Sequence, residues 1–592
     1  MPTKRQHRDQ YWVSRSDSFL LWGSLIALSV LIYDMGFFLA ILADHVADNV
    51  VAALLYLLAI VAVIRTRLSV RCQLTDKAHF WREWLIPVTL FVAAVLRTGH
   101  GNHLLGIGYS LGEVLILASV ILVFFVELSR KSFTVFRRQL NPALVFMLSF
   151  AIMILLGASL LLLPAATTAG ISPIDALFTS TSAVCVTGLS VLDTQFGFTR
   201  FGQTVILLLI QIGGLGIMTF TSVFAYFFTG KFTYDSQIFL SSINQEERFS
   251  QIFHTLYRVV LITVFLEVAG FVAIWLTLPS ELFANWGDRS YTALFHTVSA
   301  FCNAGFSTFS SGLFDPALRF NYPLHLSIAL LIIMGGIGFT ILYNGYEYLR
   351  YRFWLLPRST SGRSSHRPWV LNFNSRLVLL TTSILLMVGT LAFLMSEWNG
   401  VLAGHQGLGK VVEAFFLSVT PRTAGFNTID MGALTPGTLI LIILLMWIGA
   451  SPGSTGGGIK TSTFALATLN IWGTIRGKNR IEIFRREISN SSLRLSYTVI
   501  SLSLIVIGFS IFLLMLANPE IGLLPLGFEV FSAFSTVGLS LGITSLLSPV
   551  GKLILIGCMF IGRVGAFTLL ISLFKQVPYA PYRYPKETVS VS

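Results

Sequence analysis

Four short segments of the chain each end in glycine, and their residue types favour coordination of a cation by backbone carbonyl oxygens. The segments are Ser182–Gly188, Ser299–Gly305, Val419–Gly425 and Ser532–Gly538. Glycine tolerates positive φ angles and close backbone approach. Rings of backbone carbonyl oxygens can replace the water shell of a cation. The four segments therefore predict one coordinating ring made of four extended strips.

The predicted strips are the last five residues of each segment, and the name "strips" is kept for them below. They are Val184, Cys185, Val186, Thr187 and Gly188; Phe301, Cys302, Asn303, Ala304 and Gly305; Pro421, Arg422, Thr423, Ala424 and Gly425; and Phe534, Ser535, Thr536, Val537 and Gly538.

A single segment of this kind would more simply be a packing motif, because small residues let membrane helices approach closely. Four copies at nearly even spacing, each between two long apolar runs, favour the ring instead. Cys185 and Cys302 occupy the same position, which indicates a need for small size rather than a metal ligand. Asn303 and Thr423 are predicted to help hold the strips, and His296 to pack or to form a hydrogen bond.

A second glycine-rich pattern follows each segment. It reads Gly213-Gly214-Leu-Gly216, Gly335-Gly336-Ile-Gly338 and Gly562-Arg563-Val-Gly565, and the third copy runs from Gly449 to Thr461 with Pro452 inside it. A helix with that proline and so many glycines cannot stay regular. Irregular backbone at mid-membrane depth is tolerated only inside protein or beside water. The third copy is therefore predicted to be a loop that obstructs ions beneath the ring.

The residues assigned to this gate are Gly453, Ser454, Thr455, Gly456, Gly457, Gly458, Lys460 and Arg563. The stretch also imitates a phosphate-binding loop. That interpretation is rejected, because Ile459 separates the last glycine from Lys460 and no strand precedes a soluble helix here.

Arg563 stands alone as a cation within an apolar run. A charge inside the membrane is costly, and by default it predicts a functional role. Near the axis, Arg563 would raise a barrier to cations; the alternative is an arginine that pairs with carbonyl groups and pins helices together. Glu267 is predicted to serve packing or a lateral pair.

The composition places these motifs in a membrane. Hydrophobic residues make up 54% of the 592 residues and charged residues only 11%. The apolar residues form runs of about 20, enough to cross a hydrocarbon core of ~30 Å as helices. The predicted class is an all-α integral membrane protein.

Two long apolar runs flank each segment, so the chain is predicted to repeat a helix–pore loop–helix unit four times around one pseudo-fourfold pore. The first helices are predicted at 142–163, 256–278, 377–395 and 497–516, and the second at 205–228, 324–343, 439–466 and 553–574. The pore segments are predicted to start near Asp175, Thr292, Glu413 and Glu529, with the negative ends of their dipoles toward the ion. About four further helices come first, at 19–43, 50–64, 84–96 and 104–127.

These elements predict five parts. Residues 1–140 form an N-terminal transmembrane extension; 141–230, 231–348 and 349–480 form pore units 1, 2 and 3; and 481–592 form pore unit 4 with a C-terminal tail. Most of the net charge of +13 lies in loops, and Lys and Arg mark the cytoplasmic side. We expect a multi-pass protein of the inner (plasma) membrane, in contact with lipid and not with nucleic acid, with both termini cytoplasmic and the four segments facing outside.

Two other classes stay open as alternatives. A cation-coupled secondary transporter for another solute usually shows inverted repeats and intramembrane carboxylates, whereas these repeats run in one direction. A membrane-embedded enzyme needs acid, base or nucleophile side chains that converge on a cavity. The sequence shows no such carboxylate pair or His and Cys constellation, so transport is favoured and no enzyme activity is expected.

The motifs Val-Cys-Val-Thr-Gly-Leu, Phe-Cys-Asn-Ala-Gly-Phe, Arg-Thr-Ala-Gly-Phe-Asn and Ser-Thr-Val-Gly-Leu-Ser occur with Ser-Pro-Gly-Ser-Thr-Gly-Gly-Gly-Ile-Lys and Ile-Gly-Arg-Val-Gly. Together they resemble the Trk/Ktr/HKT superfamily of potassium transporters, and most of all the bacterial KtrB membrane subunit. The resemblance covers residues 141–575. The N-terminal extension departs from it.

The resemblance implies uptake of K⁺, with Na⁺ as an activator and no organic cofactor. It also implies a homodimer with one pore per chain, and a cytosolic ring of nucleotide-binding, KtrA-like regulatory subunits as partner. Arg563 and residues 453–458 match the cavity barrier and gating loop of that superfamily. Gly188 matches its potassium-selective members, whereas sodium-preferring plant relatives carry serine there.

Overall fold

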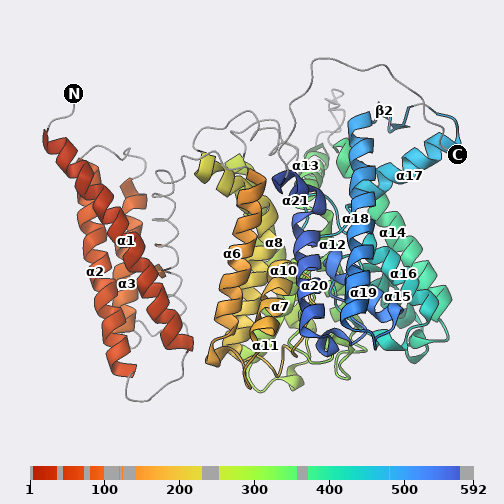
Figure 1. Ribbon diagram of the computed structural model, residues 1–592, viewed down its shortest axis with the longest axis horizontal. Helices are drawn as coiled ribbons and strands as arrows, with labels where there is room; N and C mark the ends of the chain where they lie inside the picture. The colour runs from red at the N-terminus through yellow and green to blue at the C-terminus, as the bar shows by residue number, and fades with distance from the viewer. Residues whose placement is uncertain are drawn as a thin grey trace.

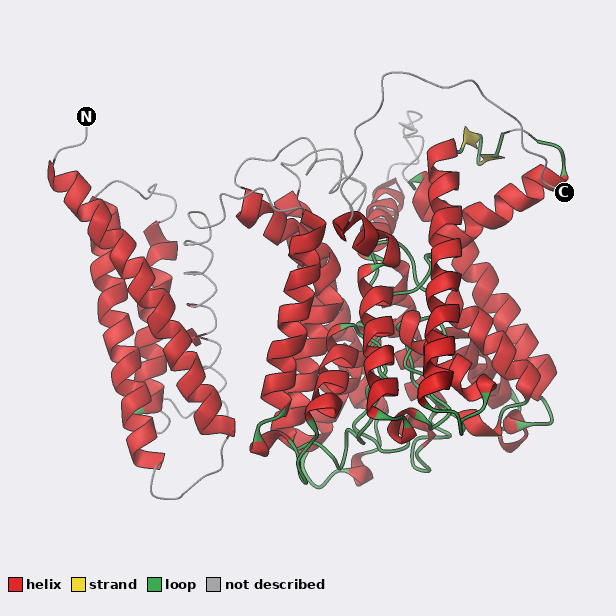
Figure 2. Ribbon diagram, viewed as in Figure 1, coloured by secondary structure: helices red, strands yellow, loops and turns green. Residues whose placement is uncertain are grey.

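The computed structural model describes residues 4–36, 44–71, 80–98, 142–229, 252–355, 371–478 and 480–573, with four single positions between 116 and 123. Within these ranges the elements are helices, apart from one short antiparallel hairpin of β1 (Glu482–Ile483) and β2 (Arg486–Glu487) (Figures 1 and 2). The mostly helical prediction is confirmed for this part of the chain.

Three N-terminal helices pack on one another as a group of their own (Figure 1). They are α1 (Lys4–Gly36), α2 (Asp44–Arg71) and α3 (Phe80–Arg97), and their buried apolar residues form a cluster separate from the main core. Arg65 Nε donates a hydrogen bond of 2.7 Å to Asp17, which ties α2 to α1. All three begin earlier than predicted, because polar residues continue each helix beyond its apolar run. The helix predicted at 104–127 lies largely outside the described residues.

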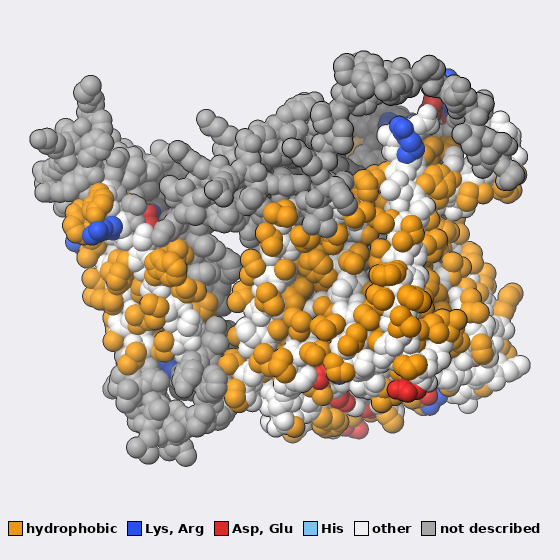
Figure 3. Space-filling view, viewed as in Figure 1, with side chains coloured by type: hydrophobic (Ala, Val, Ile, Leu, Met, Phe, Trp, Pro, Cys, Tyr) orange, Lys and Arg blue, Asp and Glu red, His pale blue; other side chains and the backbone are white. Residues whose placement is uncertain are grey.

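The first long helices of the predicted units are present where the sequence places them. They are α6 (Pro142–Leu161), α10 (Ile252–Thr277), α14 (Phe373–Glu397) and α18 (Asn490–Ala517). Stretches of α10, α14 and α18 are long and apolar enough to cross a membrane, as is Val50–Ser69 of α2. Hydrophobic side chains dominate the face of the molecule seen in Figure 3, which is the surface expected beside lipid.

The second long helices differ from the prediction, because three of the four are broken. Only α8 (Arg200–Thr229) is continuous. The others are the pairs α12 (Tyr322–Ile337) and α13 (Phe339–Leu355), α16 (Pro436–Trp447) and α17 (Thr461–Ile475), and α20 (Pro549–Val564) and α21 (Ala566–Leu573). The α12–α13 pair bends by 102°. Gly338 and Gly565 have φ angles of 97° and 89° at their breaks, a conformation that a helix cannot contain.

Four short helices lead into the strips: α7 (Pro173–Val184), α11 (Trp286–Phe301), α15 (Leu408–Val419) and α19 (Leu523–Phe534). Only α7 starts where predicted, with Asp175 in its first turn and Ser172 Oγ accepting from the Asp175 N–H. The starts predicted at Thr292, Glu413 and Glu529 are wrong, because these residues lie inside their helices. Burial of Glu413 and Glu529 shows that neither carboxylate serves as a helix-terminal charge.

Short 3-10 turns complete the connections at η2 (Pro164–Ala166), η4 (Ser280–Leu282), η5 (Gly312–Phe314), η7 (Val401–Gly404), η8 (Met431–Ala433) and η9 (Thr544–Leu546). The main hydrophobic core lies around the short helices and strips, and it includes Phe178, Phe295 and Phe416.

Candidate functional site

The strips share an unusual backbone conformation. The fifth residue of each seven-residue segment has a positive φ angle, which side chains other than glycine rarely allow. The angles are 56° at Val186, 62° at Asn303, 70° at Thr423 and 51° at Thr536, and the glycines two positions later have angles from 71° to 95°. Positive φ angles at alternate residues allow the carbonyl oxygens of a strip to face one side, as a cation filter of backbone carbonyls requires.

The four strip glycines approach one another in a closed cycle. A Cβ atom added to any of them would come within 2.7 Å of the carbonyl oxygen that precedes the glycine of the next strip. The pairs are Gly188 with Ala304, Gly305 with Ala424, Gly425 with Val537, and Gly538 with Thr187. Backbone meets backbone at each corner, so only glycine fits.

In three of the four segments, the serine that opens the segment forms a hydrogen bond with the backbone at or just after the closing glycine; in the third segment Thr420 Oγ1 donates to the Phe426 carbonyl instead. Ser182 Oγ accepts a hydrogen bond of 3.0 Å from the Gly188 N–H, and Ser532 Oγ accepts one of the same length from the Gly538 N–H. In the second segment the hydroxyl of Ser299 instead donates to the carbonyl oxygen one residue beyond the glycine, at 2.8 Å. These local bonds hold strained residues that would otherwise relax.

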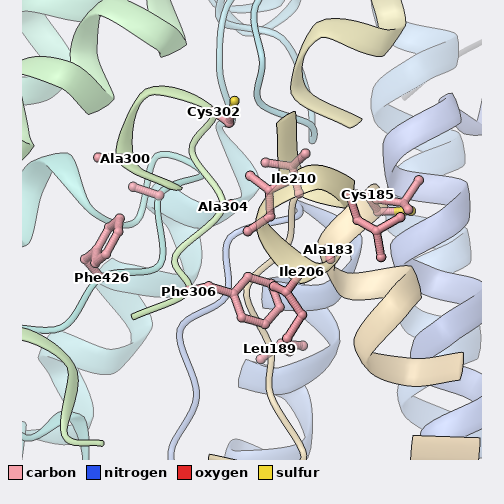
Figure 4. Packing of buried hydrophobic residues seen from close by; sticks show 14 of the residues in the cluster. Ala183, Cys185, Leu189, Ile206, Ile210, Ala300, Cys302, Ala304, Phe306 and Phe426 are labelled. Atoms are coloured by element: carbon pink, nitrogen blue, oxygen red, sulfur yellow. The ribbon is translucent and has the colours of Figure 1, made fainter. Parts of the chain in front are cut away.

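Apolar packing surrounds the strips (Figure 4). Cys185 and Cys302 are buried, and Phe306, just after the second strip, packs in one cluster with Ile206 and Ile210 of α8. Among the residues that the structure describes, no three His, Cys, Asp or Glu side chains gather closely enough to hold a metal ion. Both cysteine side chains lie in the main hydrophobic core.

The glycine-rich stretch between α16 and α17 is an irregular loop, as predicted, and the name "inner loop" is used below for residues 448–460. Its two ends meet in a single bridge between Ile448 and Ile459. The Ser451 N–H donates 3.0 Å to the Gly336 carbonyl at the end of α12, and Gly453 accepts 3.1 Å from the Phe339 N–H. The break in α16–α17 thus fits against the break in α12–α13.

The tip of the inner loop lies against two strips. The Gly457 N–H donates 3.0 Å to Thr536 Oγ1. A Cβ atom on Gly456 would collide with Thr423 Oγ1, and one on Gly457 with Thr536 Oγ1. Lys460 Nζ donates 2.7 Å back to the Gly456 carbonyl, which closes the tip on itself. The predicted neighbourhood of loop and strips is therefore present.

Arg563 joins the inner loop to the first predicted unit. It is buried, and its Nη2 donates 2.6 Å to the carbonyl oxygen of Gly213 in α8, while Nη1 donates to the carbonyl of Thr455. The Thr455 N–H in turn donates to the Gly335 carbonyl at 3.4 Å. These contacts describe an arginine that pairs with carbonyl groups and pins separate elements together.

Glu267 forms a lateral pair, which is one of the two roles that the sequence leaves open for it. Its Oε1 accepts a hydrogen bond of 2.9 Å from Gln211 Nε2 on α8, and Gln211 Oε1 lies 3.7 Å from the Cys302 sulfur. One polar chain therefore runs from α10 through α8 to the second strip. Sequence reasoning missed Gln211, although it is a lone amide in an apolar run.

A buried polar cluster between α12 and α15 was also missed. Glu413 Oε1 lies 2.6 Å from His325 Nδ1, with both side chains fully buried, and the Tyr322 hydroxyl lies 3.1 Å from His405 Nδ1. Burial lowers the pKa of His405, which lies outside the long helices, because a charged imidazole would lose its hydration there. The sequence did contain a signal for this cluster, because its polar residues stand alone at the ends of apolar runs.

The chain matches a family model described as "TrkH: Cation transport protein" over residues 117–582. It is 36% identical over 461 residues to the potassium/sodium uptake protein NtpJ of Enterococcus hirae, an alignment that covers 76% of this chain and 98% of that relative. It is also 36% identical over 451 residues to the Ktr system potassium uptake protein B of Vibrio alginolyticus, covering 75% and 94% of the two chains.

A likeness of fold accompanies the likeness of sequence. The crystal structure of the potassium transporter TrkH from Vibrio parahaemolyticus matches with a TM-score of 0.57 at 19% sequence identity, over 89% of this chain and 98% of that chain. The chain therefore shares its overall fold with a solved structure.

Proposed function

We propose, from the premise that the chain belongs to the TrkH family of cation transport proteins, that it takes up K⁺ across the cytoplasmic membrane through the four strips. The family consists of membrane cation transporters, and the chain is not an enzyme. The four predicted units supply one strip each to a single pseudo-fourfold pore. The membrane potential drives the ion inward, at about 2.3 kcal/mol per charge for each ~100 mV.

The closed cycle of strip glycines is the observation that carries this proposal. Such a cycle brings four backbones to one point, where their carbonyl oxygens can take the place of water around a dehydrated ion. Positive φ angles two residues apart in every strip support the same orientation of the carbonyls. We assign the selectivity filter to the twenty residues of the strips.

The inner loop and Arg563 form the gate in this proposal. The loop touches Thr423 and Thr536 at the strips, and Arg563 holds it there through the Thr455 carbonyl. Permeation then requires the loop to leave the path. A buried guanidinium beside the inner loop also repels cations. Residues 453–458 and Lys460 move together as the obstructing part.

The names of the relatives support a proposal about the partners and the ions of this chain. Two of them are each named as protein B of a Ktr system, which implies further components, and NtpJ is named for both potassium and sodium. We propose a homodimer with one pore per chain, a cytosolic nucleotide-binding ring as regulator, and Na⁺ as an activator. We also propose that the chain lies in the inner (plasma) membrane with both termini in the cytoplasm.

Expression in a bacterium that lacks its own potassium-uptake systems tests the transport proposal. Growth at low external K⁺ and uptake of Rb⁺ are expected when the full chain is in the membrane. Purified protein in liposomes with an imposed potential should also take up Rb⁺, which separates the chain's own activity from that of a partner. Membrane-inserted protein that neither restores growth nor moves Rb⁺ would overturn the proposal.

A further inference from the structure

One position on the short helices carries a different residue in each predicted unit, and it lies behind the strips. It is the residue three places before each seven-residue segment: Thr179, His296, Phe416 and Glu529. All four side chains are buried. Two of them, His296 and Glu529, carry groups that can hold a strip from behind, and these two belong to units 2 and 4.

His296 holds the segment that follows the second strip. Its Nδ1 lies 2.8 Å from the Thr292 carbonyl oxygen, and its Nε2 lies 3.0 Å from Ser307 Oγ. Since a carbonyl can only accept, Nδ1 carries the proton and Nε2 accepts from the Ser307 hydroxyl. The ring also packs 6.3 Å from that of Phe426, which follows the third strip.

Glu529 holds the segment that follows the fourth strip. Its Oε1 accepts hydrogen bonds from the Ser540 hydroxyl and, at 3.1 Å, from the Thr544 hydroxyl. Its other oxygen is also buried. Burial of a carboxyl group costs free energy unless the group is hydrogen-bonded. The bonds from these two hydroxyl groups offset that cost for Glu529.

The two contacts are equivalent in detail. Ser307 and Ser540 each lie two residues after the strip glycine. Each Oγ also accepts from a backbone N–H two residues further on, at 3.0 Å from Phe309 and 2.9 Å from Gly542. A histidine and a glutamate thus make the same kind of contact, as acceptors from a serine hydroxyl group, at matching positions.

Units 1 and 3 lack this support. Thr179 Oγ1 has no hydrogen-bond partner among the described residues, and Phe416 has no polar group. The segment after the third strip is tied outward instead, where the Asn427 carbonyl accepts 3.0 Å from the Leu313 N–H. The support behind the strips therefore has twofold symmetry, although the glycine cycle is fourfold.

We propose that His296 and Glu529 are positioning residues that fix the two opposite strips of units 2 and 4, and thereby set the preference for K⁺ over Na⁺. This inference rests on the proposed transport function. Discrimination by carbonyl oxygens requires strips that do not collapse onto the smaller ion. A strip that has lost this hydrogen bond can close around Na⁺. Transport continues, but the preference for K⁺ falls.

Competition of K⁺ and Na⁺ against Rb⁺ uptake in proteoliposomes tests the inference. The ratio of the two inhibition constants is independent of how much active protein is present. Glu529→Leu and His296→Leu are expected to lower the K⁺ preference at least about fivefold, the factor that corresponds to one lost hydrogen bond of ~1 kcal/mol. Glu529→Gln keeps the acceptor and should stay within about twofold of the unaltered chain.

Thr179→Val and Phe416→Leu are the matched controls, because they change the same position without removing a strip contact. Both should keep the K⁺ preference. If the Glu529→Leu protein does not insert into the membrane, Ser540→Ala tests the same contact from the other side. Ser190→Ala, at the equivalent site of unit 1, is its control. The positioning role is overturned if the unaltered chain prefers K⁺ and the Glu529, His296 and Ser540 variants prefer it equally. An unaltered chain without preference overturns the filter itself.

Discussion

Arg563 Nη2 donates a hydrogen bond of 2.6 Å to the carbonyl oxygen of Gly213, which lies 350 residues earlier in the chain. The bond joins α20, near the end of the described chain, to α8 in the first predicted unit. With the second bond to Thr455, one guanidinium connects both of these helices to the inner loop. Removal of this side chain should therefore loosen the loop and the bundle together.

Arg563→Gln is expected to raise the rate of Rb⁺ uptake in proteoliposomes several-fold, because the loop loses its anchor and the path loses a positive charge. Bonds from a charged donor contribute about 1.5–3 kcal/mol each, so a lower Tm should accompany the gain. Arg563→Lys keeps the charge but cannot reach both carbonyl groups with one ammonium. An intermediate rate is expected for it. Equal rates in all three proteins would show that Arg563 only packs.

Gly188→Ser is expected to lower the preference for K⁺ over Na⁺. The residue has a φ angle of 95°, and a Cβ atom would collide with the Ala304 carbonyl, which must move. Gly170→Ser is the matched control, since Gly170 has a φ angle of 83° but no atom within 4 Å of an added Cβ. Backbone strain without a filter contact costs about 1 kcal/mol of stability and leaves ion preference unchanged. Similar ion preference in both variants contradicts a filter at Gly188.

Gly457→Ala is expected to open the gate. The added methyl group collides with Thr536 Oγ1 and its neighbouring carbons, so the tip of the inner loop must shift away from the fourth strip. Faster Rb⁺ uptake with unchanged ion preference is the predicted result. Gly437→Ala in α16, where an added Cβ meets no atom within 4 Å, should leave transport unaltered. Slower uptake in Gly457→Ala would mean that the loop conducts ions rather than blocks them.

Lys552→Met is expected to destabilise the contact between the fourth and first units. Lys552 Nζ lies 2.6 Å from Asp175, and the two side chains are only 12% and 19% exposed. Loss of this shielded partner should cost about 1–3 kcal/mol, seen as a lower Tm in detergent. The Arg200–Asp288 pair is 53% and 42% exposed, so Arg200→Met should cost less than about 1 kcal/mol. Equal losses in the two variants would show that burial does not set the strength of these pairs.

The long helices could be predicted from sequence because an apolar run of sufficient length has few other structures available in a membrane. The starts of the short helices could not be predicted from the sequence. Glu413 and Glu529 resemble residues of a helix N-terminus, yet α15 and α19 begin earlier, without a side-chain cap. Their carboxyl groups bind His325, Ser540 and other partners distant in sequence, which no local pattern reveals.

The inner loop was predictable from its proline and glycines, whereas the breaks at Gly338 and Gly565 were not. A single glycine is tolerated within a helix at a cost of about 1 kcal/mol, so it predicts a break only weakly. Gly338 lies against the Pro452 carbonyl of the inner loop, a tertiary contact that no local pattern reveals. The partners of Arg563 depend in the same way on tertiary contacts.

The cycle of four glycines closes within a single polypeptide. In an assembly of four identical chains, every substitution appears at all corners at once, and a harmful change is multiplied by four. Here each corner is encoded separately, so one codon alters one quarter of the ring. The residues behind the four corners can therefore differ from one another, as Thr179, His296, Phe416 and Glu529 do.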